Sequence, residues 1–143
     1  MRALGLDVGE RRIGVAVSDP DGTVAVPVTV IERKSEAAAL GEITALIRDH
    51  DIDRIIVGMP LSLDGNLGKQ AETVQAFEQS LKECTDVPVV DWDERLSTLH
   101  AERMMVEAGV KRGKRKRRLD SVAAAIILQG YLDRQRNETS NLD

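Results

Sequence analysis

Short apolar runs separated by turn signals open the chain and predict three strands. Residues Ala3–Val8 and Ile13–Ser18 are two such runs, and Gly9, Glu10, Arg11 and Arg12 separate them. A third run, Val24–Ile31, follows the Asp-Pro-Asp-Gly stretch at 19–22. Glycine-containing turns of this length join antiparallel neighbours. We therefore expect three successive antiparallel strands.

The apolar spacing then becomes helical and alternates with two more strands. Ser35 can cap a first helix, and its apolar positions are Ala39, Leu40, Ile43, Leu46 and Ile47. A second helix has Ala71, Val74, Phe77 and Leu81 at the same spacing. Arg54–Val57 and Val87–Trp92 are strand-like runs that follow these helices. Helical crossovers of this kind join parallel strands.

Two helices are predicted in the last third of the chain. Ser97 or Thr98 opens the first, whose apolar face is Ala101, Met104, Met105 and Ala108. The last helix runs from about Asp120 to Leu132, and its small residues favour close packing on a sheet. We predict a single α/β domain over residues 1–136, with a mixed five-stranded sheet flanked by helices. Residues 137–143 form a polar, frayed tail.

Composition narrows the class of protein. The 143 residues are 42% hydrophobic and 31% charged, the balance of one soluble domain. Phe77, Trp92 and Tyr131 are the only aromatic residues, so an aromatic platform for stacking bases is not expected. A lone cysteine, Cys84, excludes an internal disulfide, and no apolar run approaches a membrane span. We expect a cytoplasmic protein without a membrane segment.

Positive charge is concentrated in one short segment. Seven cations lie within residues 111–118 of a chain whose net charge is −4. They are Lys111, Arg112, Lys114, Arg115, Lys116, Arg117 and Arg118. Such a loop can hold a nucleic-acid backbone, and the alternative is a solvated loop without a partner.

Three acidic residues in separate segments are the candidate catalytic groups. Asp7 interrupts an apolar strand, Glu94 follows the fifth strand, and Asp120 begins the last helix. Strand ends meet at one edge of such a sheet, so the three carboxylates can converge there. Carboxylate oxygens suit Mg²⁺ or Mn²⁺, and one or two such ions can promote phosphodiester hydrolysis. The alternatives are an N-cap role for Asp120 and a helix-dipole role for Glu94.

Other residues have candidate supporting roles. Arg12 and Arg95 are placed to contact a phosphate, and Arg95 could instead orient Glu94. The turn-rich segment 58–65 is a candidate wall of a substrate groove. Ser97 and Thr98 have no nearby base in the sequence, so a serine or threonine nucleophile is disfavoured.

Four motifs together resemble the YqgF/RuvX family of the RNase H-like superfamily. They are DVGERRIGVAVSD, IIVGMPLSLDG, WDERLST, and LDSVAAAIILQGY after the basic segment, and the likeness covers nearly the whole chain. The resemblance implies a cytoplasmic bacterial nuclease that processes the 5′ end of precursor 16S ribosomal RNA. The family is also described as Holliday junction resolvases. By this similarity, Asp7, Glu94 and Asp120 are the metal-binding catalytic residues.

The related RuvC-type resolvases carry a fourth carboxylate three residues from the last one. Here those positions hold Arg117 and Ala123, and Asp93 is a candidate replacement. We therefore favour precursor rRNA, free or in a ribosomal precursor particle, over branched DNA as the substrate. The chain could work as a monomer or a homodimer.

Two other classes of function compete with a nuclease. The DVG motif and the following hairpin also resemble the first phosphate motif of actin-like ATPases, but those proteins contain two copies of the fold. A non-catalytic adaptor could instead use the basic segment to dock on RNA, a ribosome or a transcription complex. An Asp7→Asn variant separates the adaptor, which needs no carboxylate there, from the nuclease.

Overall fold

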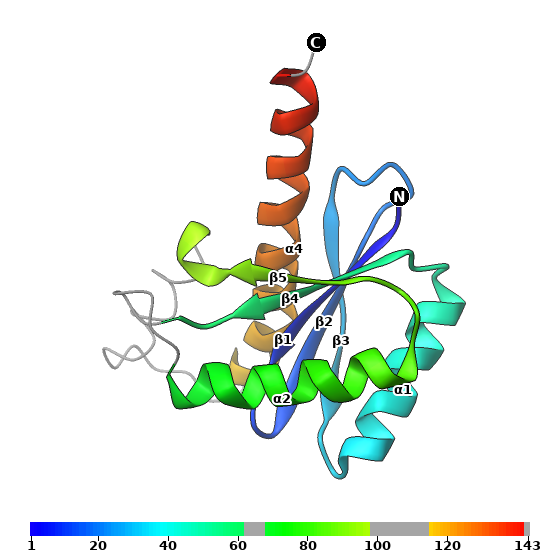
Figure 1. Ribbon diagram of the computed structural model, residues 1–143, viewed down its shortest axis with the longest axis vertical. Coiled ribbons are helices and arrows are strands. Elements are labelled where there is room, and N and C mark those ends of the chain that lie inside the picture. The colour runs from blue at the N-terminus through cyan, green and yellow to red at the C-terminus, as the bar shows by residue number, and fades with distance from the viewer. Residues whose placement is uncertain (62–67, 98–114, 142–143) are drawn as a thin grey trace.

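A mixed five-stranded sheet forms the centre of the computed structural model, which describes residues 1–61, 68–97 and 115–141 (Figure 1). The strands are β1 (Ala3–Val8), β2 (Arg12–Ser18), β3 (Ala25–Glu32), β4 (Arg54–Met59) and β5 (Val89–Asp93). Their order across the sheet is β3-β2-β1-β4-β5. The first three pair antiparallel, whereas β4 and β5 are parallel to β1. The predicted sheet is confirmed.

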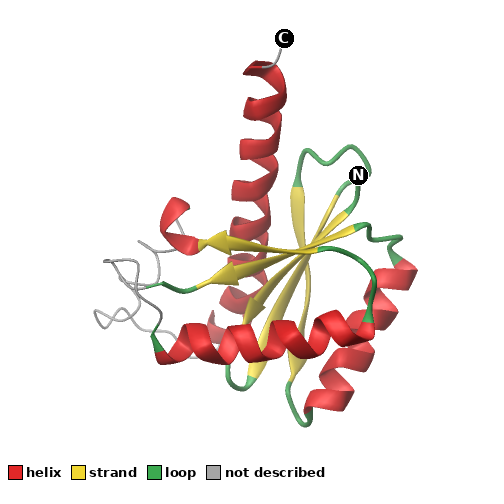
Figure 2. Cartoon of the chain, viewed as in Figure 1, coloured by secondary structure: helices red, strands yellow, loops and turns green. Residues whose placement is uncertain are grey.

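Helices cover both faces of this sheet (Figure 2). The α1/α2 face is covered by α1 (Glu36–Asp49) and α2 (Lys69–Cys84), and the α4 face is crossed by α4 (Arg115–Asn141). A short 3-10 helix, η1 (Glu94–Leu96), follows β5. Figure 1 shows the C-terminal part of α4 projecting beyond the sheet.

On the central strand, the two faces differ in the size of their side chains. Because side chains alternate along a strand, β1 places Leu4, Leu6 and Val8 on the α1/α2 face and Ala3 and Gly5 on the α4 face. A Cβ at Gly5 would lie 2.8 Å from the Leu128 Cβ. The α4 backbone therefore approaches the sheet more closely than any larger residue at position 5 would permit.

Local sequence signals account for the start of α1 and for the turn between β2 and β3. Ser35 is the N-cap of α1, as predicted, and its side chain accepts a hydrogen bond from the Ala38 backbone N–H. In the turn before β3, Asp19 accepts from the N–H groups of Thr23 and Val24, and Gly22 has a φ of 70°. These hydrogen bonds, from Thr23 first, hold the pKa of Asp19 below its usual value.

The predicted limits of the last helix are wrong at both ends. The helix begins at Arg115 instead of Asp120 and ends at Asn141 instead of Leu132. Arg and Lys are good helix formers, and residues 133–141 contain neither Gly nor Pro, so nothing stops the helix. Arg134 and Glu138 also form an i,i+4 ion pair. Residues 137–141, expected in a frayed tail, are therefore helical.

The helix predicted after Ser97 or Thr98 lies outside the described residues, except for Ser97 itself. Ser97 is the C-cap of η1, and its hydroxyl donates to the Glu94 carbonyl. Within the described ranges, no helix has the length and apolar character needed to cross a membrane.

Candidate active site

Asp7 lies near the end of the central strand, on the α4 face. It is 8% exposed and pairs directly with Gly14 of β2. It follows Ala3 and Gly5 at two-residue spacing, so all three point toward the α4 side of the sheet. The prediction of a buried acidic residue within the first strand is confirmed.

Asp120 is brought to the same place by the absence of a side chain at Gly14. A Cβ at Gly14 would lie only 1.8 Å from the backbone oxygen of Asp120. No side chain fits in that gap, so α4 crosses β2 directly over the partner of Asp7. The proposed N-cap role of Asp120 is wrong, because Asp120 lies inside α4, five residues after its first residue.

Glu94 approaches from the other side, over β4. It is 3% exposed, in η1, and its Oε1 would lie 3.0 Å from a Cβ placed on Gly58. Gly58 follows Val57, and Val57 pairs with Leu6, the residue before Asp7. Gly14, Asp7 and Gly58 are therefore at one level across three adjacent strands. The three acidic residues lie at the same end of the α4 face.

The donor set suits a hard divalent cation, but the described structure does not present a finished metal site. Among residues 1–61, 68–97 and 115–141, no three His, Cys, Asp or Glu side chains form a recognisable metal-binding group. Neither Asp7 nor Glu94 is without an interaction partner in the chain, so their burial alone does not require a metal. Their oxygen atoms and shared position fit Mg²⁺ or Mn²⁺. Coordination by the three residues stays a prediction.

Arg12 lies at the edge of this site, as its predicted phosphate contact requires. Its guanidinium is 3.8 Å from a carboxylate oxygen of Asp120 and also 3.8 Å from one of Glu32. These ion pairs are long and partly exposed, so an incoming phosphate could exchange with them. Arg12 also lines a pocket of about 510 Å³ with Gly9, Glu10, Arg11, Gln70 and Asp120.

Arg95 and Asp93 form a direct ion pair. The Arg95 Nη2 donates to Asp93 Oδ2 at 2.7 Å, and its Nε donates to Oδ1 at 3.0 Å. Asp93 also accepts from the Arg95 backbone N–H as the cap of η1. This pairing is bidentate and charge-assisted. A role of Asp93 as a replacement fourth ligand stays a prediction.

The basic segment is divided between a described and an undescribed part. Lys111, Arg112 and Lys114 lie outside the described residues. Arg115, Lys116, Arg117 and Arg118 belong to the first turns of α4, so the expectation of a loop is wrong for these four positions. The start of α4 leads directly to Asp120, which brings these basic positions close to the acidic site along the chain.

Sequence reasoning missed two features near the site. Gln70, in the first turn of α2, lines the pocket beside Arg12, and its Nε2 donates to the Val8 carbonyl. Only its position after the turn-rich segment 58–65 hinted at this role, and residues 62–65 of that segment lie outside the described structure. Gly58 was placed in that segment, but its contact with Glu94 depends on pairing between distant strands.

Sequence comparisons identify relatives along almost the full length of the chain. The family model described as "RuvX: Holliday junction resolvase" matches residues 1–134. A protein of Desulforamulus reducens named "Putative pre-16S rRNA nuclease" is 49% identical over 133 residues, covering 93% of this chain and 97% of the relative. A protein of the same name from Halothermothrix orenii is 52% identical, covering 94% and 96%.

Solved structures show the same fold at low sequence identity. RuvC of Thermus thermophilus, solved with a Holliday junction substrate, matches with a TM-score of 0.60 and 15% identity, covering 94% of this chain and 96% of RuvC. The yeast mitochondrial Holliday junction resolvase Ydc2 has a TM-score of 0.54 and 12% identity, covering 99% and 84%. The fold is therefore that of the RNase H-like resolvases, and the chain belongs to the RuvX (YqgF) family of nucleases.

Proposed function

We propose that this protein is a metal-dependent endonuclease that cleaves the 5′ region of precursor 16S rRNA. The observation that supports this most is the placement of Asp7, Glu94 and Asp120 at the same end of the α4 face. Asp7 and Glu94 are buried, and their elements are fixed by the sheet, so their carboxylates are held in place before substrate binds.

In this proposal, the three acidic residues would hold one or two Mg²⁺ or Mn²⁺ ions. When bound, the ions would lower the pKa of a water molecule and offset negative charge on the scissile phosphate. Arg12 would contact a substrate phosphate from the Asp120 side, in the pocket next to the β1–β2 turn. The basic residues at 111–118 would bind the backbone of the same strand without reading its sequence.

The choice of RNA over a DNA junction has two supports. The similar proteins of D. reducens and H. orenii are each named "Putative pre-16S rRNA nuclease". In addition, position 117 is Arg and Ala123 is buried against the sheet, so neither can be the fourth carboxylate of a RuvC-type centre. The enzyme would then act in the cytoplasm, on free precursor rRNA or on a precursor particle.

Holliday junction cleavage is the second candidate function. The family model carries that description, and the RuvC structure with a similar fold was solved with a junction. Junction resolution needs two coordinated cuts, which a symmetric dimer provides. A homodimer would therefore accompany this second function, whereas a monomer suffices for RNA processing.

The test compares a precursor 16S leader RNA and a four-way DNA junction in Mg²⁺ or Mn²⁺. Asp7→Asn should abolish cleavage because it removes a charged oxygen ligand and leaves the packing of β1 intact. Asp49→Asn is the matched control, since Asp49 ends α1 on the opposite face and its side chain is 64% exposed. We expect metal-dependent RNA cleavage by the wild type and the control.

Three results would change this conclusion. Paired cuts in the junction without RNA cleavage would favour the resolvase. Cleavage that persists in Asp7→Asn would remove the proposed catalytic role of that residue. Tight RNA binding without cleavage, unchanged in Asp7→Asn, would favour a non-catalytic adaptor.

A further inference from the structure

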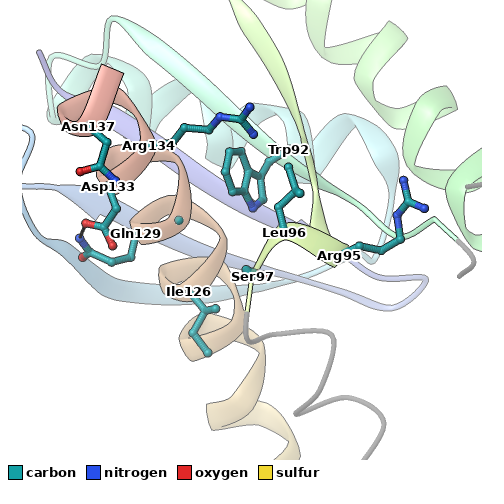
Figure 3. Close-up of a pocket in the computed structure, with 10 residues that line it drawn as sticks. Trp92, Arg95, Leu96, Ser97, Ile126, Gln129, Asp133, Arg134 and Asn137 are labelled. Atoms are coloured by element: carbon teal, nitrogen blue, oxygen red, sulfur yellow. Dashed lines mark hydrogen bonds between the residues drawn. The ribbon is translucent and has the colours of Figure 1, made fainter. Parts of the chain in front are cut away.

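Arginines near the acidic residues differ in how firmly they are held. A pocket of about 660 Å³ lies between η1 and the C-terminal half of α4 (Figure 3). Its arginines are paired with carboxylates, Arg95 with Asp93 at 2.7 Å and Arg134 with Glu138 at 3.5 Å. In the smaller pocket beside the β1–β2 turn, the ion pairs of Arg12 are 3.8 Å long. Ion pairs of this length hold a side chain weakly, so the position of Arg12 depends on the turn that carries it.

The β1–β2 turn, residues 9–12, links the candidate metal ligand Asp7 to the candidate phosphate contact Arg12. The Gly9 N–H donates to the Arg12 carbonyl at 2.8 Å, and a Cβ at Gly9 would lie 2.9 Å from the same oxygen. The turn is therefore closed so tightly that only glycine fits at its first position. A displacement of the Gly9 backbone would move Arg12 with it.

Arg33, the residue after β3, holds this turn through both its backbone and its side chain. Its N–H donates to the Arg11 carbonyl at 2.8 Å, and its Nη1 donates to the Gly9 carbonyl at 2.7 Å. Figure 1 shows the β1–β2 turn and the end of β3 at the same end of the sheet. Hydrogen bonds from a charged donor are stronger than those from a neutral one. Arg33 therefore fixes the turn at two of its carbonyl groups.

The Arg33 side chain is itself held from the α1/α2 face. Its guanidinium carbon lies 5.0 Å from the centre of the Phe77 ring, and Phe77 is buried on α2. Its Nη2 lies 3.9 Å from Glu36 at the start of α1, and the side chain is 15% exposed. Asp7 and Asp120 lie on the opposite face of the sheet. Arg33 is therefore placed to act on the turn and not on a bound substrate.

Gln70 adds a second contact from α2 to the same backbone. Its Nε2 donates to the Val8 carbonyl at 3.3 Å, next to the Gly9 carbonyl that Arg33 holds. The two carbonyl groups directly after Asp7 are thus both tied to α2, one by Gln70 and one by Arg33 on the Phe77 ring. Gln70 lines the pocket and Arg33 does not, so Arg33 separates positioning from substrate contact.

We propose that Arg33 is a positioning residue, which holds the β1–β2 turn so that Arg12 meets a substrate phosphate. This inference rests on the proposed nuclease function, and it adds a residue that acts on the site from the other face of the sheet. A phosphate contact is made equally in the ground state and in the transition state. Loss of Arg33 should therefore raise KM and leave kcat nearly unchanged.

The kinetic test uses Arg33→Met, which keeps a long apolar side chain against Phe77 but removes the donor. The KM for precursor RNA should rise about tenfold, the effect of losing one hydrogen bond from a charged group, with kcat within about twofold. A merely structural role would instead lower the active fraction, and hence the apparent kcat, at an unchanged KM. Arg33→Lys restores a cationic donor and should keep KM within about threefold of wild type.

Two comparisons separate the turn from a general loss of charge. Arg48→Met removes the same charge from the end of α1, where the side chain is 76% exposed, and should leave KM unchanged. Arg33→Met combined with Arg12→Gln should be no worse than Arg12→Gln alone, because both changes remove one phosphate contact. Equal effects of Arg33→Met and Arg48→Met, or additive losses in the double variant, would overturn the proposal.

Amide hydrogen exchange tests the turn without any RNA. Exchange of the Gly9 N–H should be about tenfold faster in Arg33→Met, whereas that of Leu4 in the middle of the sheet should not change. Unchanged exchange at Gly9 would overturn the positioning role whether or not the protein cleaves RNA.

RNA binding distinguishes a failure of this inference from a failure of the nuclease proposal. If wild type binds precursor RNA without cutting it, and Arg33→Met weakens that binding about tenfold, the role of Arg33 stands and the nuclease is refuted. If wild type cleaves RNA and Arg33→Met leaves KM unchanged, the role of Arg33 is refuted and the nuclease stands.

Discussion

The two faces of the sheet are built from the same strands but pack against their helices differently. On the α1/α2 face, fully buried Leu4, Leu6 and Val15 meet the helices through their side chains. On the α4 face, Gly5 and Gly14 let the helix backbone come down onto the strands. Large side chains make the first face a conventional core, whereas the second face fixes where Asp120 lies. Changes on the first face should therefore affect stability more than chemistry.

The largest loss of stability should follow from a cavity in the conventional core. Leu4→Ala removes a fully buried side chain from β1 and should lower the free energy of unfolding by about 2–5 kcal/mol. Urea unfolding measures this loss. The variant should still cleave RNA at temperatures where it is folded, because Leu4 points away from Asp7. A specific loss of cleavage without destabilisation would contradict the separation of the two faces.

A methyl group on the α4 face should have a smaller effect on stability but a larger one on activity. Gly14→Ala places a Cβ against the Asp120 carbonyl, so α4 must shift. Overpacking of this kind lowers stability by about 1–3 kcal/mol. We expect cleavage to fall far more than the folded fraction does. Unfolding and cleavage measured on one preparation would test this, and full activity would show that Asp120 need not be fixed by this contact.

A buried carboxyl group of α2 should make the stability of the protein depend on pH. Glu78 is 5% exposed, and burial, followed by a hydrogen bond and repulsion from Asp91, raises its pKa to about 8. The ordinary value is 4.5, so the unfolded chain releases this proton first. The contribution of Glu78 to stability is therefore complete below about pH 4.5 and is lost as the pH rises to about 8.

Glu78→Gln should remove this dependence, because the amide does not titrate. The variant should gain stability relative to wild type between pH 5 and 8, with little difference in cleavage at a fixed pH. Urea midpoints measured across this range provide the comparison. Parallel curves for the two proteins would show that Glu78 has an ordinary pKa.

The smallest expected change is a gain in stability. Gly41 lies within α1, and a Cβ there would meet nothing within 4 Å. Gly41→Ala should raise the free energy of unfolding by about 0.5–1 kcal/mol, because alanine has the higher helix propensity. It is the matched control for Gly14→Ala, since both add one methyl group. Destabilisation by Gly41→Ala would mean that the space beside Gly41 is occupied.

The sheet was predictable because its signals are local. Each strand is a short apolar run bounded by turn residues, and antiparallel and parallel pairing follow from the length of the connections. The Ser35 cap was predictable for the same reason, since a side chain and the N–H group three residues later suffice to form it.

The limits of α4 were less predictable, because apolar periodicity marks only the part of a helix that packs. Residues 115–118 and 137–141 have no apolar stripe, yet nothing in them breaks a helix. The sequence pattern therefore predicted the packed middle of α4 but not its two polar ends. The same limitation made Asp120 resemble an N-cap.

The sequence by itself determined the number of strands, their antiparallel or parallel character and the identity of the three candidate acidic residues, because periodicity and residue type are properties of short segments. Only the tertiary structure decided where those acidic residues lie relative to one another. That placement depends on Gly14 and Gly58, whose missing side chains admit the Asp120 backbone and the Glu94 carboxylate. Such contacts join residues far apart in the chain, and no local pattern encodes them.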